Sequence, residues 1–523
     1  MASEGVVAGS VPEVNRWVVS GAVMTGTIMA VLDSSIVNVA LPDMTSSFGA
    51  SVEQITWVVT GYILANVIIM PILGLLTERF GRKRFYLVSV ALFTISSMVC
   101  GLAGTLPMMI AARVVQGIGG GVLMTLSQAI MRESFPAEEQ GIAMGVFGMG
   151  IMLAPAIGPT LGGWITDQYS WPWVFYINVP IGILNFLLIN RYVHDPAYLV
   201  RRKSQIDWLG LALMVVGLGS LQLMLEQGAS NDWFHSSYIV ALTVISVVGI
   251  LLFIWRELAI DHPVVNLRIL KNVSFSSATF IGGILGMALM GSVFLLPLFL
   301  QSLLGYSAMD SGILMLPRSL AMGLLMPVAG RFYNRLGAKT MVGAGLAMSA
   351  YGFWGISRLS LDVGYWDLFY PQLWQGVGFG VIFVALSTAA LSSIDRPQVT
   401  AATGLYNVVR QVFGSIGISL SAAELARGTG RYKAILSEHV TVFDPATRSW
   451  MAGATASMQA AGADAFTASQ RALALLNGQM LRQAAVLAYN HIFFIVSLLF
   501  AVSIPLVFLL SSSKSAEVEI MLE

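Results

Sequence analysis

Long apolar runs separated by short polar segments dominate this chain of 523 residues. A helix that crosses a bilayer needs about 20 mostly apolar residues, and a soluble domain carries about 25% charged residues. Here 56% of the residues are hydrophobic and only 11% are charged. The sequence therefore predicts an all-α membrane protein and excludes a soluble enzyme. With a net charge of +1, nothing suggests a nucleic-acid partner.

Fourteen runs are long enough to span a membrane. They cover residues 17–41, 54–76, 85–105, 107–131, 141–166, 173–192, 207–227, 237–257, 274–303, 308–330, 340–360, 365–394, 399–425 and 486–511. We therefore expect two six-helix bundles with two extra helices between them. The expected order is a tail (1–16), a bundle (17–192), a linker (193–206), the extra pair (207–257), a linker (258–273), a second bundle (274–511) and a tail (512–523).

An internal repeat relates the two bundles. The basic segments 74–84 (GLLTERFGRKR) and 330–339 (GRFYNRLGAK) start 256 positions apart. The Gln-Gly-x-Gly strings at Gln116 and Gln375 keep nearly the same spacing, 259 positions. Two related halves in a membrane chain are typical of transporters, because two halves that rock against each other give alternating access.

Basic residues fix the expected orientation. If the N-terminus is cytoplasmic, most Lys and Arg residues fall on cytoplasmic segments, as the positive-inside rule requires. We therefore expect both termini on the cytoplasmic side of the inner membrane. One long outer loop, 427–485, precedes the last span. Its Asp444-Pro445 pair is typical of a helix start.

Two ionisable residues lie inside spans of the first bundle. By helical rise, Asp33 and Arg113 are about 12 Å and about 9 Å from the outer ends of their runs, so they lie at similar depths. A carboxylate inside a membrane is expensive and often functional. Two interpretations of Asp33 stay open: a group that binds and releases a proton, or a structural carboxylate that only holds helices.

The second bundle has charges without obvious partners. Arg318 and Arg410 lie near the middle of their spans, and no Asp or Glu lies at matching depth. With Asn38, Gln116 and Gln375, they are candidates to line a central cavity. The single Cys100 cannot form an intramolecular disulfide, and no cysteine-based metal site is expected.

The first basic loop resembles the loop motif of the major facilitator superfamily. The residues that match are Gly74, Leu76, Arg79, Gly81, Arg82 and Lys83. Glu78 stands where the family has Asp, which keeps the charge and lengthens its reach. The resemblance implies that Glu78 and Arg82 form part of a cytoplasmic gate that latches the two halves in one state.

Three further strings resemble the fourteen-helix drug:proton antiporters of that superfamily. They are Val31–Pro42 around Asp33, the Gly158-Pro159-x-x-Gly162-Gly163 motif, and Trp171–Gly182 (WPWVFYINVPIG). The family pattern around Arg113, Gln116 and Gly117 also matches, and the resemblance ties Arg113 to proton coupling. Small residues in the Gly158 motif predict close packing between the halves.

The resemblance implies an exporter of small amphipathic drugs or toxins that uses the proton gradient and needs no cofactor or metal. The long outer loop resembles the EmrB branch more than the QacA branch, which implies a periplasmic adaptor of the EmrA kind and an outer-membrane channel. One alternative is export of a single metabolite, such as a siderophore or fatty acid. Another is a sensor or channel that transports nothing uphill. The chain lacks the G-x-x-x-x-G-K-[ST] string of nucleotide hydrolysis.

Overall fold

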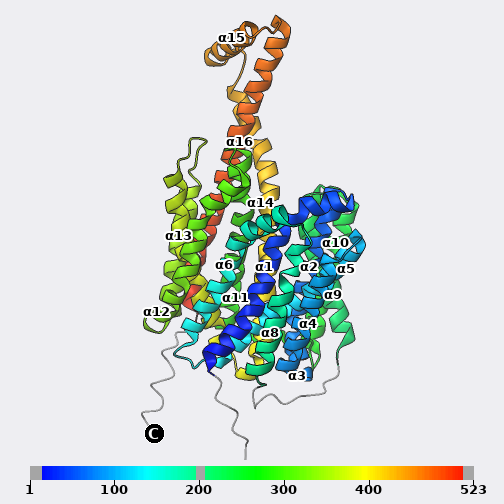
Figure 1. The fold of residues 1–523 in the computed structure, drawn as a ribbon. Coiled ribbons are helices and arrows are strands. Elements are labelled where there is room, and N and C mark those ends of the chain that lie inside the picture. Colours follow the sequence, from blue (N-terminus) through cyan, green and yellow to red (C-terminus); the bar gives the residue numbers. More distant parts are fainter. Residues whose placement is uncertain (1–14, 196–205, 511–523) are drawn as a thin grey trace, which may run out of the picture.

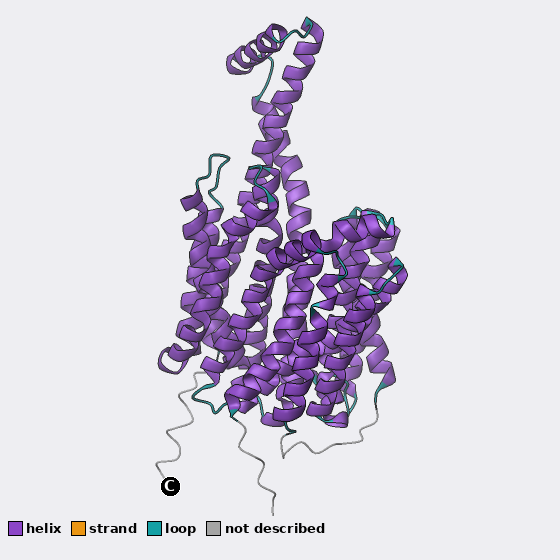
Figure 2. Cartoon of the chain, viewed as in Figure 1, coloured by secondary structure: helices purple, strands orange, loops and turns teal. Residues whose placement is uncertain are grey.

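The computed structural model describes residues 15–195 and 206–510, and within these ranges every regular element is a helix (Figure 2). The predicted tail 512–523, nearly all of the tail 1–16 and most of the linker 193–206 lie outside the described residues. The first half comprises α1 (Arg16–Phe48), α2 (Val52–Ile69), η1 (Met70–Ile72), α3 (Leu73–Phe80), α4 (Arg82–Gly101), α5 (Leu106–Ser134), α6 (Gln140–Gln168), α7 (Trp173–Tyr176) and α8 (Asn178–Tyr192).

The extra pair and the second half follow in order. The extra pair comprises α9 (Trp208–Gln227), η2 (Trp233–His235) and α10 (Ser237–Ala259), and η3 (Leu267–Lys271) leads out of it. The second half comprises α11 (Val273–Ser302), α12 (Ala308–Ile356), α13 (Tyr365–Ser392), η4 (Arg396–Gln398), α14 (Val399–His439), α15 (Pro445–Ala460), α16 (Ala465–Ser503) and η5 (Ile504–Leu509). Helix α9 packs against α2 of the first half and α14 of the second.

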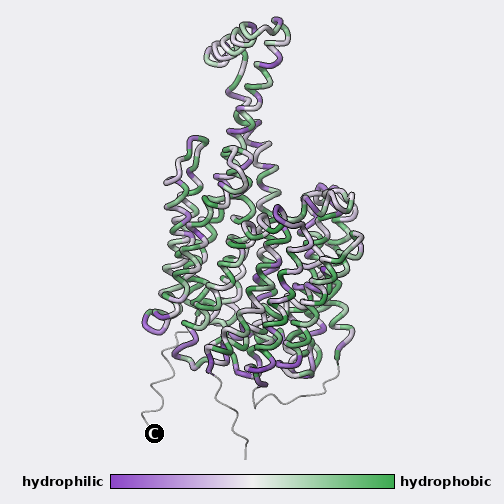
Figure 3. The backbone as a smooth tube through the Cα atoms, viewed as in Figure 1, coloured by the Kyte–Doolittle hydropathy of each residue, from purple (hydrophilic) through white to green (hydrophobic). Residues whose placement is uncertain are grey.

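The fourteen predicted passes are confirmed. Twelve helices of the described part are long and apolar enough to cross a bilayer. One of them, α12, contains two predicted spans, because Gly337 has non-helical backbone angles and turns the chain inside it. Helix α14 is more polar and is not among the twelve, yet it packs along α11 and α16. Hydrophobic residues dominate the bundle, as the green tube in Figure 3 shows.

The backbone reproduces the sequence repeat. Gly81 ends α3 with φ 85° and ψ 149°, and Gly337 breaks α12 with φ 74° and ψ 162°. These two residues stand at equivalent places in the two basic segments. Positive φ is readily adopted only by glycine, so both halves use the same residue for the same sharp turn.

Residues 427–485 lie outside the apolar runs of the bundle, and most of them are helical. Helix α14 continues to His439, and α16 begins at Ala465, so both run far out of the bundle as a helical stalk (Figure 1). Helix α15 lies across the tip. It begins at Pro445, as predicted, with Asp444 accepting a hydrogen bond from the backbone N–H of Thr447. The two helices pack closely where they leave the bundle: a Cβ on Gly428 would lie only 3.2 Å from that of Ala488.

The two halves meet tightly at the end of the bundle that holds the basic segments 79–84 and 331–339, called here the basic end. A Cβ on Gly141 of α6 would lie 2.5 Å from the carbonyl oxygen of Gly330 in α12. A Cβ on Gly74 would lie 2.7 Å from that of Ala401 in α14. Side-chain hydrogen bonds also cross here, from Asn407 to Gln128 (2.8 Å), from Arg132 to the Leu391 carbonyl (3.4 Å), and from Asn334 to the Glu138 carbonyl. The structure is therefore closed at the basic end.

We predict that Gly141→Leu keeps the basic end from closing, because the new side chain would occupy the space of the Gly330 carbonyl. Cysteines at Glu138 and Asn334, in a Cys100→Ser background, would then lose most of their reaction with a short bifunctional thiol reagent. Gly343→Leu is the matched control, since nothing lies within 4 Å of its Cβ position in α12. Undiminished cross-linking in the Gly141 variant would contradict the interpretation.

Candidate functional site: a buried charge cluster

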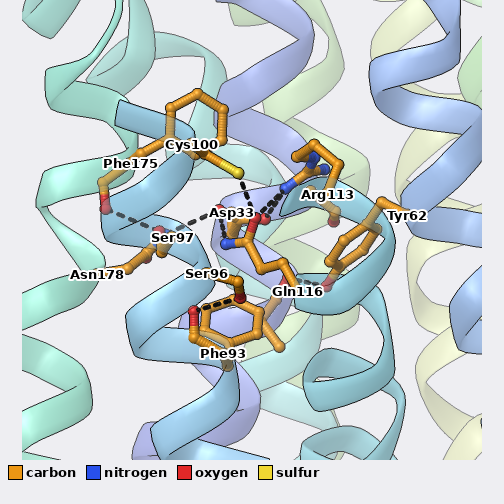
Figure 4. Close-up of polar contacts among 12 residues, drawn as sticks. Asp33, Tyr62, Phe93, Ser96, Ser97, Cys100, Arg113, Gln116, Phe175 and Asn178 are labelled. Atoms are coloured by element: carbon orange, nitrogen blue, oxygen red, sulfur yellow. Dashed lines mark hydrogen bonds and ion pairs between the residues drawn. The ribbon is translucent and has the colours of Figure 1, made fainter. Parts of the chain in front are cut away.

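Asp33 and Arg113 form a buried ion pair inside the first half. Arg113 Nη1 donates to Asp33 Oδ2 at 2.7 Å, and their side chains are 1% and 0% exposed (Figure 4). Asp33 Oδ1 accepts two more hydrogen bonds, from Gln116 (2.9 Å) and from Asn178 (2.7 Å). The carboxylate is thus held by donors from α5 and α8 while its own helix is α1.

Neighbouring helices position the guanidinium of Arg113. Its Nε donates to the Val58 carbonyl of α2 at 3.1 Å, and its Nη1 also donates to Gln116 Oε1 at 2.8 Å. The guanidinium carbon lies 4.2 Å from the ring centroid of Tyr62, a cation–π geometry. Gly117 lets α5 come this close, because a Cβ there would overlap the backbone of Tyr62.

A second chain of hydrogen bonds fixes Asn178. Its Nδ2 also contacts Ser97 Oγ of α4 at 3.1 Å, and Ser97 in turn donates to the Phe175 carbonyl at 2.9 Å. Asn178 is the first residue of α8 and belongs to the WPWVFYINVPIG segment. Sequence reasoning singled out that segment only as a family resemblance and missed its asparagine as a ligand of Asp33. The signal that could have found it is the polar side chain of Asn178 directly after the aromatic residues of that segment.

The geometry of the cluster suits a carboxylate that can lose and regain its ion-pair and hydrogen-bond donors. A buried charge is stable only when it is paired and hydrogen-bonded, and removal of one partner leaves the other charge uncompensated. Any movement of α1 relative to α5 or α8 changes the number of donors on Asp33. Cys100 completes the surroundings, with its thiol 3.6 Å from Gln116 Oε1. No group of three or more His, Cys, Asp or Glu in the described ranges could hold a metal ion.

The gate motif lies at the basic end. Arg82 of α4 is buried and pairs with Glu133 of α5, within the first half. Lys83 Nζ donates to the Asn190 carbonyl at 2.6 Å, while Glu78 and Arg79 are exposed on the last turn of α3. Gly74 is the motif residue at the contact with the second half, against α14, and Gly81 makes the turn described above.

The Gly158–Gly163 motif packs helices within the first half, so the prediction that it packs the halves together is wrong. A Cβ on Gly158 would overlap Ser35 of α1, and one on Gly162 would lie 3.1 Å from the Ile36 carbonyl. Gly163 is less crowded, and Pro159 lies inside α6. The contacts between halves are made by other glycines of the same helix, nearer the basic end, because α6 crosses α12 there.

The cavity candidates fall into two groups. Gln116 belongs to the charge cluster, and Asn38 is exposed on α1, where it donates to the Ser34 carbonyl. Arg318, Gln375 and Arg410 lie in the second half, away from Asp33. The structure therefore does not gather all five residues into one site.

From its place at the outer end of the run 207–227, Glu226 is expected to be a solvated helix end, and the structure corrects this. It is partly buried at the end of α9, which packs against α2, and it accepts a hydrogen bond from Gln222 at 2.7 Å. Gln222 also contacts Ser415 of α14 at 2.7 Å. The sequence of α9 alone could not show that Glu226 lies between the two halves, because only the tertiary packing brings α2 and α14 against α9.

Comparison with known proteins identifies the family. Residues 23–418 match the model of the Major Facilitator Superfamily. The chain belongs to this superfamily. It is 33% identical over 482 residues to the fatty acid resistance protein FarB of Neisseria gonorrhoeae, covering 92% of this chain and 93% of that protein. It is 37% identical to the multidrug export protein EmrB of Haemophilus influenzae, covering 82% and 84%, and 34% identical to EmrB of Escherichia coli K12, covering 93% of each.

A solved structure of the superfamily supports the fold. The human organic anion transporter MFSD10 aligns with a TM-score of 0.58 at 14% identity, over 93% of this chain and 99% of that chain. The protein is therefore a multi-pass membrane transporter with the major facilitator fold, and not an enzyme. At this identity, the structural likeness bears on the fold alone.

We predict that Arg113→Gln destabilises the transporter by about 3–5 kcal/mol, since it leaves a buried carboxylate unpaired. The double variant Asp33→Asn/Arg113→Gln should recover much of that loss because both charges are gone. Thermal unfolding can be followed with a thiol-reactive dye, as the only cysteine, Cys100, is buried. Arg79→Gln, at an exposed arginine, serves as the control. A single Arg113→Gln variant as stable as the wild type would show that the pair does not hold the helices.

Proposed function

We propose that the protein is a proton-driven exporter of amphipathic drugs. The observation that carries this proposal is the buried Asp33, whose carboxylate is held by three donors from two other helices. A carboxylate so placed takes up a proton when its donors move away and releases it when they return. This cycle is what antiport requires, and Arg113 remains charged through it.

Burial and donors act in opposite directions on such a carboxylate. Removal from water favours the neutral acid, whereas a nearby arginine and amide donors favour the charged form. In the structure, closed at the basic end, the donors are in place and Asp33 is paired. We propose that this is the deprotonated state, and that protonation accompanies the rearrangement of the halves. A cationic substrate can compete with the proton for the same carboxylate.

The names of the relatives support multidrug export more than any other activity. Two of the relatives above are named multidrug export proteins, and the third is named for fatty acid resistance. The name of FarB favours a second candidate function, export of fatty acids on the same scaffold. A susceptibility panel of a deletion strain, with and without the restored gene, separates broad drug resistance from protection against fatty acids alone.

The distribution of basic residues supports one orientation of the protein in the membrane. We propose that the basic end is cytoplasmic, because it holds the basic segments of both halves. The stalk of α14 and α16 then projects into the periplasm from the inner membrane. We further propose that its tip, with Phe443 and Phe466 at 85% and 74% exposure, contacts a periplasmic adaptor that leads to an outer-membrane channel.

We predict that Asp33→Asn abolishes proton-driven efflux and leaves exchange of substrate down its own gradient. The amide cannot carry the proton, but it keeps the size and most hydrogen bonds of the carboxylate. Proteoliposomes with an internal pH dye give the measurement: substrate addition should no longer move protons. Asp43→Asn, at an exposed aspartate on the same helix, is the control. A folded Asp33→Asn protein that still moves protons on drug addition would refute the assignment.

We predict that Phe443→Ser/Phe466→Ser lowers drug resistance in cells but leaves transport by the purified protein unchanged. Cysteine cross-linking from Ser469, which is exposed on α16, to a co-expressed adaptor should fall in parallel. Thr447 is a poor labelling position because its hydroxyl bonds to Asp444 and closes the α15 cap. If the tip variant keeps full resistance in cells, the stalk has no adaptor at its tip.

A further inference from the structure

The second half repeats the frame of the charge cluster but lacks its carboxylate. Gln372 Nε2 donates to the Leu314 carbonyl at 2.8 Å, just as Arg113 Nε donates to the Val58 carbonyl. Gly376 packs on the backbone of Arg318 as Gly117 packs on that of Tyr62. The repeat offsets of 256 and 259 place the counterpart of Asp33 between residues 289 and 292, where there is no acidic residue.

Arg318 occupies the place that Tyr62 holds in the first half, and it is 3% exposed. Its side chain makes one hydrogen bond within the described residues, from Nη1 to Ser292 Oγ of α11 at 2.9 Å. Guanidinium carries five N–H donors, so most of its capacity is unused. Helix α11 contains no Asp or Glu, and no ion pair involves Arg318 in the described ranges.

Uncommitted amide groups lie on the neighbouring helix. Both side-chain polar atoms of Gln375 and the Oε1 atom of Gln372 are buried without a hydrogen-bond partner among the described residues. Buried polar atoms left without a partner destabilise the fold, and a missing ligand is one ordinary explanation for them. The Gln372 amide reaches Leu314, which is one helical turn from Arg318 on α12.

A second arginine borders the seam between the halves. Arg410 of α14 makes no side-chain hydrogen bond or ion pair within the described residues, and its guanidinium carbon lies 5.4 Å from the ring centroid of Phe383. The Phe383 ring packs at the Gly148 position of α6, in the first half. Arg318 and Arg410 contact α11 at Ser292 and Gly286, six residues or about 9 Å apart along the helix.

We propose that these residues of the second half bind the anionic head group of a transported amphipathic carboxylate. We call this proposed site the pocket, and we assign to it Ser292, Arg318, Gln372, Gln375 and Arg410. The proposal rests on the export function proposed above and names one substrate class for it. The substrate brings the carboxylate that this half lacks. Arg318 and the amide N–H groups donate hydrogen bonds to its oxygens, and the positive charge of Arg410 stabilises its negative charge. The two uncompensated arginines repel a cationic head group, which distinguishes this pocket from Asp33.

The test measures binding of three probes that share a dodecyl tail, so only the head group differs. Laurate is the anion, dodecanol the neutral control and dodecyltrimethylammonium the cation. The full-length protein is held in nanodiscs of phosphatidylcholine, which has no net charge. We expect Arg318→Gln to weaken laurate binding at least about tenfold and to leave the other two probes within about twofold. Arg358→Gln, at an exposed arginine stacked on Trp354, should change none of them.

A second variant supplies the missing carboxylate from the protein itself. Ser292→Asp places an acid where the Ser292 hydroxyl now accepts from Arg318 at 2.9 Å, at the counterpart of Asp33, and should abolish laurate binding while raising the temperature of unfolding. This variant keeps the proposal open to refutation if Arg318→Gln does not fold. Laurate binding of wild-type strength in either folded variant overturns the proposal, and so does an equal loss of all three probes.

The same chemistry would also recognise an anionic lipid head group, and two measurements separate the sources. If phosphatidylglycerol in the nanodisc displaces laurate from the wild type, the pocket is a lipid site and the substrate assignment is wrong. In proteoliposomes, Arg318→Gln should lose laurate efflux and keep efflux of a cationic dye. A wild type that exports neither compound would refute the export function, whereas unchanged laurate efflux by Arg318→Gln would refute only this pocket.

Discussion

Close approach of helix backbones is the constraint on which this structure depends. Between helices in a bilayer there is no hydrophobic driving force, since lipid tails are as apolar as leucine, so packing must come from close van der Waals contact and from interhelical hydrogen bonds. The contacts at Gly117, Gly141, Gly330 and Gly376 show this directly, because a Cβ at each would meet the backbone of another helix. Two of these glycines, Gly141 and Gly330, also close the basic end.

Because the helices pack so closely, there is little room for polar atoms between them. Each buried charge therefore needs ion-pair and hydrogen-bond partners on specific neighbouring helices. The first half provides three donors for Asp33 and three acceptors for Arg113 from α1, α2, α5 and α8. The second half keeps the same helix geometry and replaces the acid by small or apolar residues. On our proposals, a symmetric scaffold with an asymmetric charge distribution gives each half its own chemistry: proton exchange in one and anion recognition in the other.

Much of the fold was predictable from the sequence, because membrane spans and a repeat are local or periodic signals. The pairing of Asp33 with Arg113 was also predictable, since equal depth on neighbouring helices leaves few other partners. Asn178 and Glu226 were not, because their roles depend on which helices meet around them. The start of a helix at Pro445 was predictable from the Asp444-Pro445 pair. The continuation of α14 to His439 was not, because the apolar run that marks its span ends near residue 425.

Helix α14 runs without a break for 41 residues, from the basic end to the stalk. At 1.5 Å per residue this is about 60 Å of continuous helix. One rod therefore joins the contact with Gly74, the guanidinium of Arg410 and the base of α15. Any tilt of the second half during transport is amplified with distance along that rod. A tilt of this helix would therefore move the tip of the stalk farther than it moves the residues inside the bundle.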